Sequence, residues 1–152
     1  MPDSLQRPGV LVLNGPNLNR LDVREPSVYG ALTLDDLQAD LRQRFPDLAL
    51  RFAQHNSEGA LIDELHAADT VETAGVVFNP GGYAHTSVAL RDAVASISTP
   101  VVEVHISNVF ARDDFRQRLV IAGACAGVVS GMGLAGYALA VAHFGGHVGA
   151  GR

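Results

Sequence analysis

The sequence predicts a single α/β domain with a five-stranded parallel sheet and helices on both faces. Short, nearly all-apolar runs alternate along the chain with segments whose apolar residues recur at helical spacing. Each apolar run ends in a polar or glycine-containing turn, as the strands of a parallel sheet covered on both faces do. The length of 152 residues and the apolar content of 47% suit one domain with a substantial core.

The first predicted strand covers residues 10–13 and ends in a turn at residues 14–17 that contains a glycine and a proline. A polar loop follows, and it carries Arg24 and Tyr29. A cation close to a tyrosine favours the phenolate and lowers a pKa that is otherwise about 10, which makes such a pair chemically useful. A surface loop with a solvated arginine and a half-buried tyrosine would explain the same residues.

The next helix is predicted from residue 34 to residue 45, with Thr33 as its N-cap and Pro46 ending the pattern. A second strand at residues 48–53 ends in a polar turn, and a helix at residues 60–68 follows it. Both helices have an apolar face with which they can cover the sheet.

The third strand is predicted at residues 75–78 and ends in a glycine-containing turn. Thr86 or Ser87 can cap the helix that continues from this turn to Ile97. The fourth strand, at residues 100–104, also ends in a polar turn.

A fifth strand at residues 126–130 and a final helix at residues 137–144 complete the alternation. The whole chain, residues 1–152, is expected to form one domain, with residues 1–8 and 145–152 flexible at its two ends.

Five strands of this kind suit the flavodoxin-like strand order 2-1-3-4-5. That order places its topological switch point between strands 1 and 3, where ligands bind outside the carboxyl ends of the strands. The loops that meet there begin at Asn14 and Asn79, and both are strongly polar. We therefore expect the functional site at this edge of the sheet.

The turn after the third strand contains Gly81 and Gly82, which let the backbone approach a ligand, and it leads into a helix N-terminus, which favours anions. His85 would then lie at the mouth of the site. The alternative is a glycine turn before a capped helix, with His85 in solvent.

Glu103 and His105 are two residues apart at the end of the fourth strand, so their side chains should share one face of the sheet. A carboxylate beside an imidazole orients the ring and favours its charged form, as a general acid requires. A strand-end histidine bonded only to backbone is the alternative, and the polar residues Ser107 and Asn108 favour a pocket.

The formal net charge of −5 argues against nucleic acid and anionic membranes as partners. An anionic small molecule could still bind where arginine side chains concentrate. The six histidines are scattered and no second cysteine exists, so no metal site is predicted.

The single cysteine, Cys125, lies in an apolar run, where a buried structural thiol is expected. A single cysteine excludes an internal disulfide and fits a reducing cytosol. Neither an apolar signal core nor a stretch long enough to span a bilayer is recognisable, so a cytoplasmic protein is expected.

Gly131, Gly133 and Gly136 match the dinucleotide-binding glycine fingerprint and lie between a strand and a helix. They follow the last strand, however, and no acidic residue stands ~20 positions downstream. We interpret them as sites of close helix–sheet packing. A flavodoxin-like nucleotide- or flavin-binding module is kept as the alternative function.

Four segments carry a family resemblance: residues 14–18 with 24–29, then 78–92, 102–108 and 131–137. Together they resemble the type II 3-dehydroquinate dehydratases of the shikimate pathway, over nearly the whole chain from about Val10 to Val141. The resemblance implies a flavodoxin-like dodecamer, a tetramer of trimers, that serves aromatic amino acid biosynthesis, with quinate breakdown, which uses the same elimination, as the alternative role. Its reaction eliminates water from 3-dehydroquinate to give 3-dehydroshikimate through an enolate intermediate, without a metal or an organic cofactor.

The resemblance also implies five catalytic roles. Tyr29 would be the phenolate base that removes the C2 proton, and Arg24 the cation that keeps it ionised. Asn17 would hold a water against the developing enolate oxygen. His105, oriented by Glu103, would be the acid that protonates the departing C1 hydroxyl.

The remaining implied residues bind the substrate. Asn79, His85 and Arg116, with Gly81, Gly82 and the backbone amides of Ile106 and Ser107, would hold the carboxylate and ring hydroxyls. Asp92 would be offered by a neighbouring subunit. Arg112 would close over the site together with the Arg24 loop.

The chain departs from the family pattern at three places. His55 stands where the family usually has serine, and Ala84 stands where it usually has threonine. Residues 117–121 are more apolar than the family's usual sequence. None of these departures changes the proposed acid or base.

Overall fold

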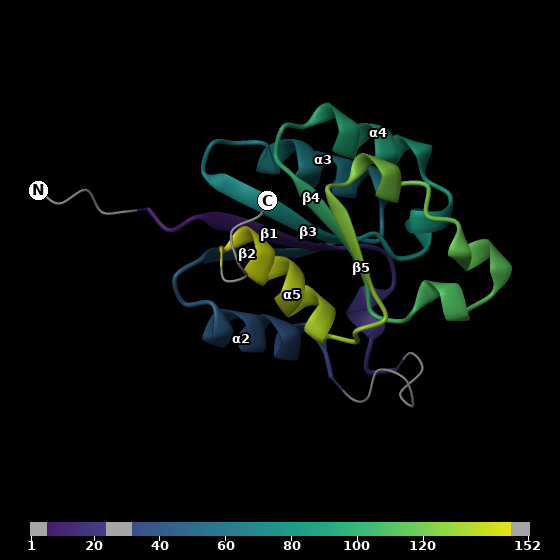
Figure 1. Ribbon diagram of the computed structural model, residues 1–152, viewed down its shortest axis with the longest axis horizontal. Coiled ribbons are helices and arrows are strands. Elements are labelled where there is room, and N and C mark those ends of the chain that lie inside the picture. Colours follow the sequence, from purple (N-terminus) through teal and green to yellow (C-terminus); the bar gives the residue numbers. More distant parts are fainter. Residues whose placement is uncertain (1–5, 24–31, 147–152) are drawn as a thin grey trace, which may run out of the picture.

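The computed structural model describes residues 6–23 and 32–146, and in this part of the chain five parallel strands form one sheet (Figure 1). The strand order is β2-β1-β3-β4-β5, which confirms the predicted flavodoxin-like order. The strands are β1 (Gly9–Asn14), β2 (Ala49–Gln54), β3 (Thr73–Asn79), β4 (Val101–His105) and β5 (Gly127–Ser130). Each predicted strand is present, with ends that differ by at most two residues.

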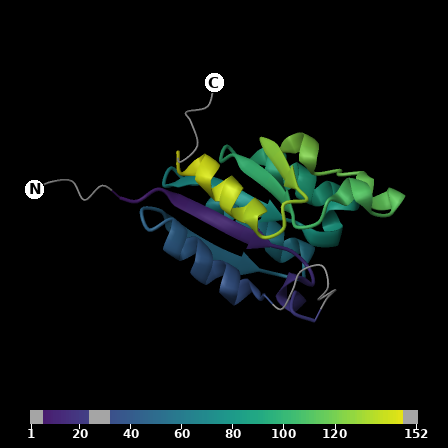
Figure 2. The same cartoon turned by 60° about the horizontal axis from the view of Figure 1, so that its bottom comes forward.

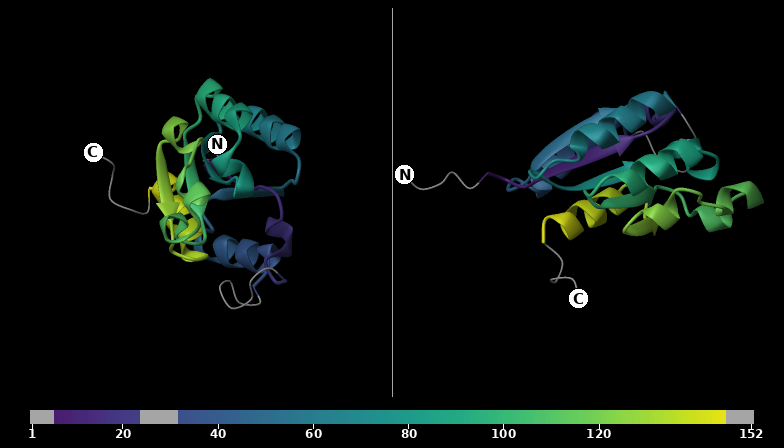
Figure 3. Two further views of the ribbon diagram at one scale, coloured as in Figure 1. Left: turned by 90° about the vertical axis from the view of Figure 1, so that its right-hand side faces the viewer. Right: turned by 90° about the horizontal axis from the view of Figure 1, so that it is seen from above.

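In the described residues four α-helices cover both faces of the sheet, three of them between successive strands and the fourth after the last strand. They are α2 (Leu34–Arg44), α3 (Glu58–Ala68), α4 (Val88–Ser96) and α5 (Ala135–Phe144). Helices α2 and α5 lie side by side on one face (Figure 2), and α3 and α4 cover the other (left view of Figure 3). The predicted α/β layering is therefore confirmed.

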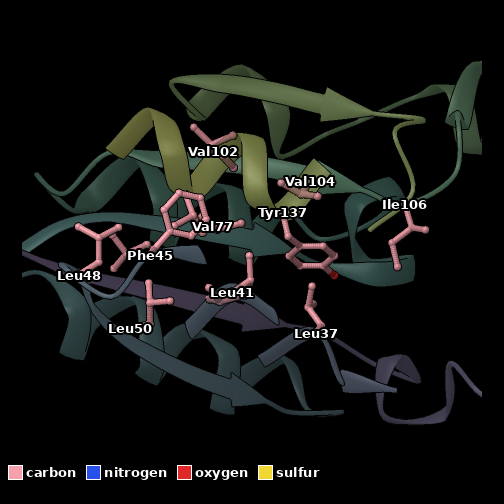
Figure 4. Close-up of a cluster of buried hydrophobic side chains, with 14 of the residues drawn as sticks. Leu37, Leu41, Phe45, Leu48, Leu50, Val77, Val102, Val104, Ile106 and Tyr137 are labelled. Atoms are coloured by element: carbon pink, nitrogen blue, oxygen red, sulfur yellow. The ribbon is translucent and has the colours of Figure 1, made fainter. Parts of the chain in front are cut away.

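The alternation of side chains along β1 divides the core into two clusters. Val10 and Val12 face α2 and α5, whereas Leu11 and Leu13 face α3 and α4. Figure 4 shows the first cluster, in which the ring of Tyr137 packs among apolar side chains and its hydroxyl points toward the end marked by Ile106.

Side-chain caps fix where the helices begin. The Thr33 hydroxyl accepts a hydrogen bond from the backbone N–H of Asp36, and the Asp36 carboxylate accepts one from Thr33 N–H at 2.9 Å. The bond from the Thr33 backbone N–H, and a second from the Thr33 hydroxyl to Asp36 Oδ2 at 3.0 Å, lower the pKa of Asp36. At α4 the cap is Ser87 and not Thr86, since the Ser87 hydroxyl accepts from Leu90 N–H at 2.9 Å.

The segment between β4 and β5 contains structure that helical periodicity did not predict. It forms three short 3₁₀ helices, η3 (Val109–Ala111), η4 (Asp114–Gln117) and η5 (Ala122–Ala124). A run of three or four residues is too short to show a recognisable apolar period. This segment extends beyond the carboxyl edge of the sheet and forms part of the site described below (Figure 3).

The three glycines of the fingerprint have different roles, which corrects the expectation that all three allow close packing of a helix on the sheet. Gly136 does pack helix against sheet, because a Cβ there would lie 3.3 Å from a Val129 methyl group. Gly131 and Gly133 are instead turn residues with φ of 90° and 61°.

No described helix has the length and apolar character needed to cross a lipid bilayer.

Cys125 is half-buried, and its thiol donates to the Ile121 carbonyl at 3.7 Å. Burial raises the pKa of the thiol to about 12, with the Glu103 charge adding to the effect. The side chain is less deeply buried than predicted, and the raised pKa disfavours the reactive thiolate.

Candidate active site

The polar ends of β1 and β3 meet at the switch point of the sheet. Asn14 and Asn79 occupy paired positions in the strand register, and both side chains are buried. The hydroxyl of Tyr137 lies between them: it donates to Asn14 Oδ1 at 2.6 Å and accepts from Asn79 Nδ2 at 2.8 Å. Sequence reasoning missed Tyr137. A lone tyrosine in an apolar helix is the signal that could have identified it, because a buried phenol requires a polar partner.

The loops after these two strands pack directly on each other. Gly15 N–H donates to the Asn79 carbonyl at 2.8 Å, and a Cβ at Gly15 would lie only 2.5 Å from the Pro80 carbonyl oxygen. Gly81, with φ of 60°, donates its N–H to Asn79 Oδ1 at 3.1 Å. Glycine is therefore required at both positions for the loops to approach this closely.

A pocket opens at this edge of the sheet, beside the loops that gather at the right-hand end of Figure 1. Its lining brings together nine of the predicted site residues: Asn79, Gly81, Gly82, His85, His105, Ile106, Ser107, Arg112 and Arg116. Leu18, Leu21 and Val109 also line it and were not predicted. These three supply an apolar wall, and nothing in an apolar residue type alone marks it as part of a site.

Glu103 and His105 form the hydrogen-bonded pair that their spacing predicted. Glu103 Oε1 lies 2.7 Å from His105 Nε2, and the Glu103 side chain is completely buried behind the histidine. Glu103 Oε2 has no hydrogen-bond partner among the described residues. The carboxylate accepts a hydrogen bond from the Nε2–H group of His105. Nδ1 is therefore the ring nitrogen left to exchange a proton with a molecule in the pocket.

His85 lies next to His105, and the two rings stack with their centroids 6.3 Å apart. His85 Nδ1 donates to the Arg118 carbonyl at 3.0 Å. Burial lowers the pKa of His85 from its ordinary value of 6.5, and the nearby charges of His105 and Arg116 lower it further. His85 is therefore a neutral polar group at neutral pH, suited to hydrogen bonding with a ligand.

Two guanidinium groups make the pocket suitable for an anion. Arg112 donates to the Ser107 hydroxyl at 3.4 Å, and the Arg116 guanidinium lies 4.9 Å from the centre of the Phe115 ring. The described lining contains no carboxylate. A small anionic ligand would meet two cations and the backbone amides of the glycine-containing turn.

Three of the predicted residues that the structure describes are not in this lining: Glu103, which lies behind His105, and Asp92 and Asn17. Asp92 is exposed on α4, and Asn17 is exposed in the loop after β1, next to the lining residue Leu18. Arg24 and Tyr29 lie outside the described residues. Within the described ranges, no group of three or more His, Cys, Asp or Glu residues could hold a metal ion.

The three sequence departures lie around the site without entering it. His55 Nε2 pairs with Glu64 on α3 at 3.0 Å. Ala84 is completely buried, and its carbonyl accepts from Val120 N–H at 2.8 Å. Ile121 is completely buried in the cluster beneath α3 and α4, which explains the apolar character of this stretch.

Comparison with known proteins adds to this geometry. The model of the class II dehydroquinase family matches residues 8–145. The chain is 57% identical over 136 residues to a 3-dehydroquinate dehydratase of Bacillus pumilus, an alignment that covers 88% of this chain and 92% of that protein. It is 53% identical over 133 residues to one of Pelodictyon phaeoclathratiforme, with 87% and 88% covered. The crystal structure of a type II dehydroquinase from Butyrivibrio crossotus superposes with a TM-score of 0.87 at 40% identity, covering 91% of this chain and 97% of that one.

Proposed function

The chain belongs to the class II dehydroquinase family and is a 3-dehydroquinate dehydratase, a lyase of the shikimate pathway, and we propose that the pocket beside His105 is its active site. One observation carries the assignment to this pocket. A buried carboxylate–imidazole pair faces a lining that contains two arginines and a glycine-containing turn. The imidazole would supply the acid for the leaving hydroxyl, and the two arginines would bind the substrate's carboxylate.

The elimination requires a base, an enolate-stabilising group and an acid. Removal of the C2 proton beside the ketone places negative charge on oxygen, so this charge must be stabilised. We assign Tyr29 as the base, Arg24 as the cation that favours its phenolate, and Asn17 as the residue that holds a water against the enolate oxygen. These three roles rest on the sequence motif that the chain shares with the family.

His105 is assigned as the acid that protonates the departing C1 hydroxyl. The 2.7 Å contact with Glu103 holds the ring in one orientation before the substrate arrives. Glu103 acts through His105, and its complete burial keeps the carboxylate away from the reacting atoms.

We assign the rest of the lining to substrate binding. Arg116 and Arg112 would approach the carboxylate, and His85 would hydrogen-bond a ring hydroxyl in its neutral form. Asn79, Gly81, Gly82, Ile106 and Ser107 would supply amide groups. We further propose that Arg112 closes over the bound substrate together with the Arg24 loop.

We propose that the enzyme is a homododecamer built as a tetramer of trimers, and that it works in the cytoplasm. Asp92 is exposed and stands apart from the pocket of its own chain, so it is available to a neighbouring subunit. Val128, Met132 and Leu139 are exposed on or next to β5 and α5, and assembly would cover such apolar surface. Sedimentation should then show a particle far heavier than 16 kDa, and a clean monomer would contradict this assembly.

The nucleotide- or flavin-binding alternative is not favoured. Its sequence support was the glycine fingerprint, but Gly131 and Gly133 form a turn and Gly136 packs a helix against the sheet. A purified protein without bound flavin, whose melting temperature does not change with nucleotide, is the expected result.

The test is a direct assay with a matched pair of histidine variants. Dialysed protein is mixed with 3-dehydroquinate and excess chelator, and the near-ultraviolet absorbance of the conjugated enone is followed. His105→Gln should lower kcat by about 10²–10⁴-fold, since it removes the acid. His66→Gln, on an exposed histidine of α3, is the control and should leave turnover unchanged.

Tyr29→Phe should abolish turnover while substrate still stabilises the protein against heat, because only the phenolic oxygen is lost. Near-normal turnover in either His105→Gln or Tyr29→Phe would refute the role assigned to that residue. Loss of activity with chelator in the wild-type protein would refute the proposal that the reaction needs no metal.

A further inference from the structure

Asn17 has an unusual backbone conformation for a residue assigned to catalysis. Among the described residues it is the only one other than glycine with a positive φ, at 68°. Asparagine tolerates this left-handed region better than most residues, but the conformation still persists only where the surroundings hold it.

A side-chain amide from the loop after β2 provides the contact. Asn56 Oδ1 accepts the backbone N–H of Asn17 at 3.0 Å. The same oxygen accepts from Gln54 Nε2 at 3.0 Å, and Gln54 Nε2 also donates to the Gly15 carbonyl at 3.1 Å. The loop after β1 is thus tied at two points to the loop after β2.

The hydrogen bonds of this network can run in only one direction. A backbone N–H can only donate, so the Asn56 atom that faces Asn17 must be the amide oxygen. The Gln54 atom that faces both this oxygen and the Gly15 carbonyl must then be the amide nitrogen, which has two hydrogens to donate. Each side-chain amide is therefore fixed in orientation by the backbone of the loop.

The clamped loop forms part of the pocket. Its other side is held to the end of β3 by the bond from Gly15 N–H to the Asn79 carbonyl. Leu18, the residue after Asn17, lines the pocket directly. Asn56 itself is exposed and does not line the pocket, so its contact bears on the placement of Asn17 and not on substrate contact.

We propose that Asn56, supported by Gln54, is a positioning residue for the elimination. Its amide oxygen holds the backbone of Asn17 in the left-handed conformation, and this directs the Asn17 side chain toward the enolate oxygen. The proposal rests on the role proposed above for Asn17. It adds two residues that touch neither the substrate nor the reacting atoms.

A conservative pair of variants separates this role from a general effect on folding. Asn56→Ala removes the acceptor, and kcat should fall by about 10-fold or more while KM changes less than about 3-fold, because small misplacements of catalytic groups are costly. Asn56→Asp keeps an oxygen at the same place and should retain turnover within about 3-fold of the wild-type protein. Since residue 56 is exposed, both variants should melt close to the wild-type temperature.

Gln54→Glu tests the direction of the network from its other end. The substitution is nearly isosteric, but it places carboxylate oxygens opposite the Gly15 carbonyl and Asn56 Oδ1, so it should lower kcat as Asn56→Ala does. Normal turnover in Gln54→Glu, or a loss in Asn56→Asp as large as that in Asn56→Ala, would overturn the proposal.

Asn17→Ala, measured in the same assay, separates the role proposed for Asn17 from the role proposed for Asn56. If Asn17→Ala loses turnover and Asn56→Ala does not, the clamp is refuted while the role of Asn17 stands. If Asn17→Ala is fully active, the role of Asn17 is refuted and the clamp with it. Turnover by the wild-type protein would still support the dehydratase function. If both lose turnover and the double variant loses no more than Asn17→Ala alone, Asn56 acts through Asn17 as proposed.

Discussion

Removal of one oxygen atom from Tyr137 should lower both the stability of the protein and its affinity for substrate. In Tyr137→Phe the ring still fills its place in the core, but the bonds to Asn14 at 2.6 Å and to Asn79 at 2.8 Å are lost. Both amides are 3% exposed, so water cannot replace the hydroxyl without a rearrangement. Leaving a buried polar group unsatisfied costs about 1–3 kcal/mol, so the two together should lower the free energy of unfolding by about 2–6 kcal/mol.

The chain offers a matched control. Tyr83→Phe removes the same atom from a partly exposed tyrosine, whose hydroxyl makes a single long bond of 3.4 Å to the Asn56 carbonyl. Its effect on the free energy of unfolding should stay within about 0.5 kcal/mol. For a chain of this length each kcal/mol shifts the melting temperature by about 2–4 °C, so Tyr137→Phe should melt about 4–24 °C lower than the wild-type protein.

The assay is thermal denaturation of the wild-type protein and both variants at one protein concentration, because assembly would make the midpoint depend on concentration. The dehydratase assay on the same samples should show a KM for 3-dehydroquinate that rises in Tyr137→Phe, since Asn79 loses one of its anchors. Equal melting temperatures for the two variants would refute the reasoning, because they would show that the buried hydroxyl contributes no more than an exposed one.

Three further predictions follow from the described residues. Burial lowers the pKa of His85 below 6.5, so as the pH falls the imidazole is protonated in the unfolded chain before it is protonated in the folded protein, and the folded state loses stability. His85→Asn should therefore reduce the loss of stability between about pH 7 and pH 5. Denaturation midpoints at several pH values would show this difference. Gly15→Ala should destabilise the protein and reduce turnover, because the new Cβ would lie 2.5 Å from the Pro80 carbonyl, whereas Gly127→Ala, with no atom within 4 Å of its Cβ, should not reduce turnover. The pKa of about 12 predicts that Cys125 resists alkylation at pH 8 in the folded protein and reacts once it is denatured, which mass spectrometry would detect.

Local signals in the sequence were sufficient for the fold and for part of the site. Thr33 could be predicted as a cap because the capping interaction spans only three residues. The pairing of Glu103 with His105 followed from the two-residue period of a strand. The meeting of the loops at Asn14 and Asn79 followed from the strand order, since the register places the two residues opposite each other.

Interactions between distant segments could not be predicted in this way. Tyr137 is 58 residues from Asn79 and 123 residues from Asn14, and no local pattern records that its hydroxyl fits between them. Leu18 has the same apolar character whether it lies in the core or lines a pocket. The clamp from Asn56 to Asn17 depends on the geometry of two loops that are brought together only when β1 and β2 pair.

The strongest physical sign of function in the described structure is a defect in hydrogen bonding. Glu103 Oε2 is the one buried side-chain oxygen or nitrogen without a partner in the described ranges, and the carboxylate to which it belongs is completely buried. A buried charge that is only partly satisfied lowers stability, and a neutral side chain of the same shape would avoid the cost. The fold nevertheless places this group 2.7 Å from His105, at the wall of a pocket with two arginines. Such a local cost persists where function requires it, and the proposed role of His105 as the acid would require an imidazole held in one orientation.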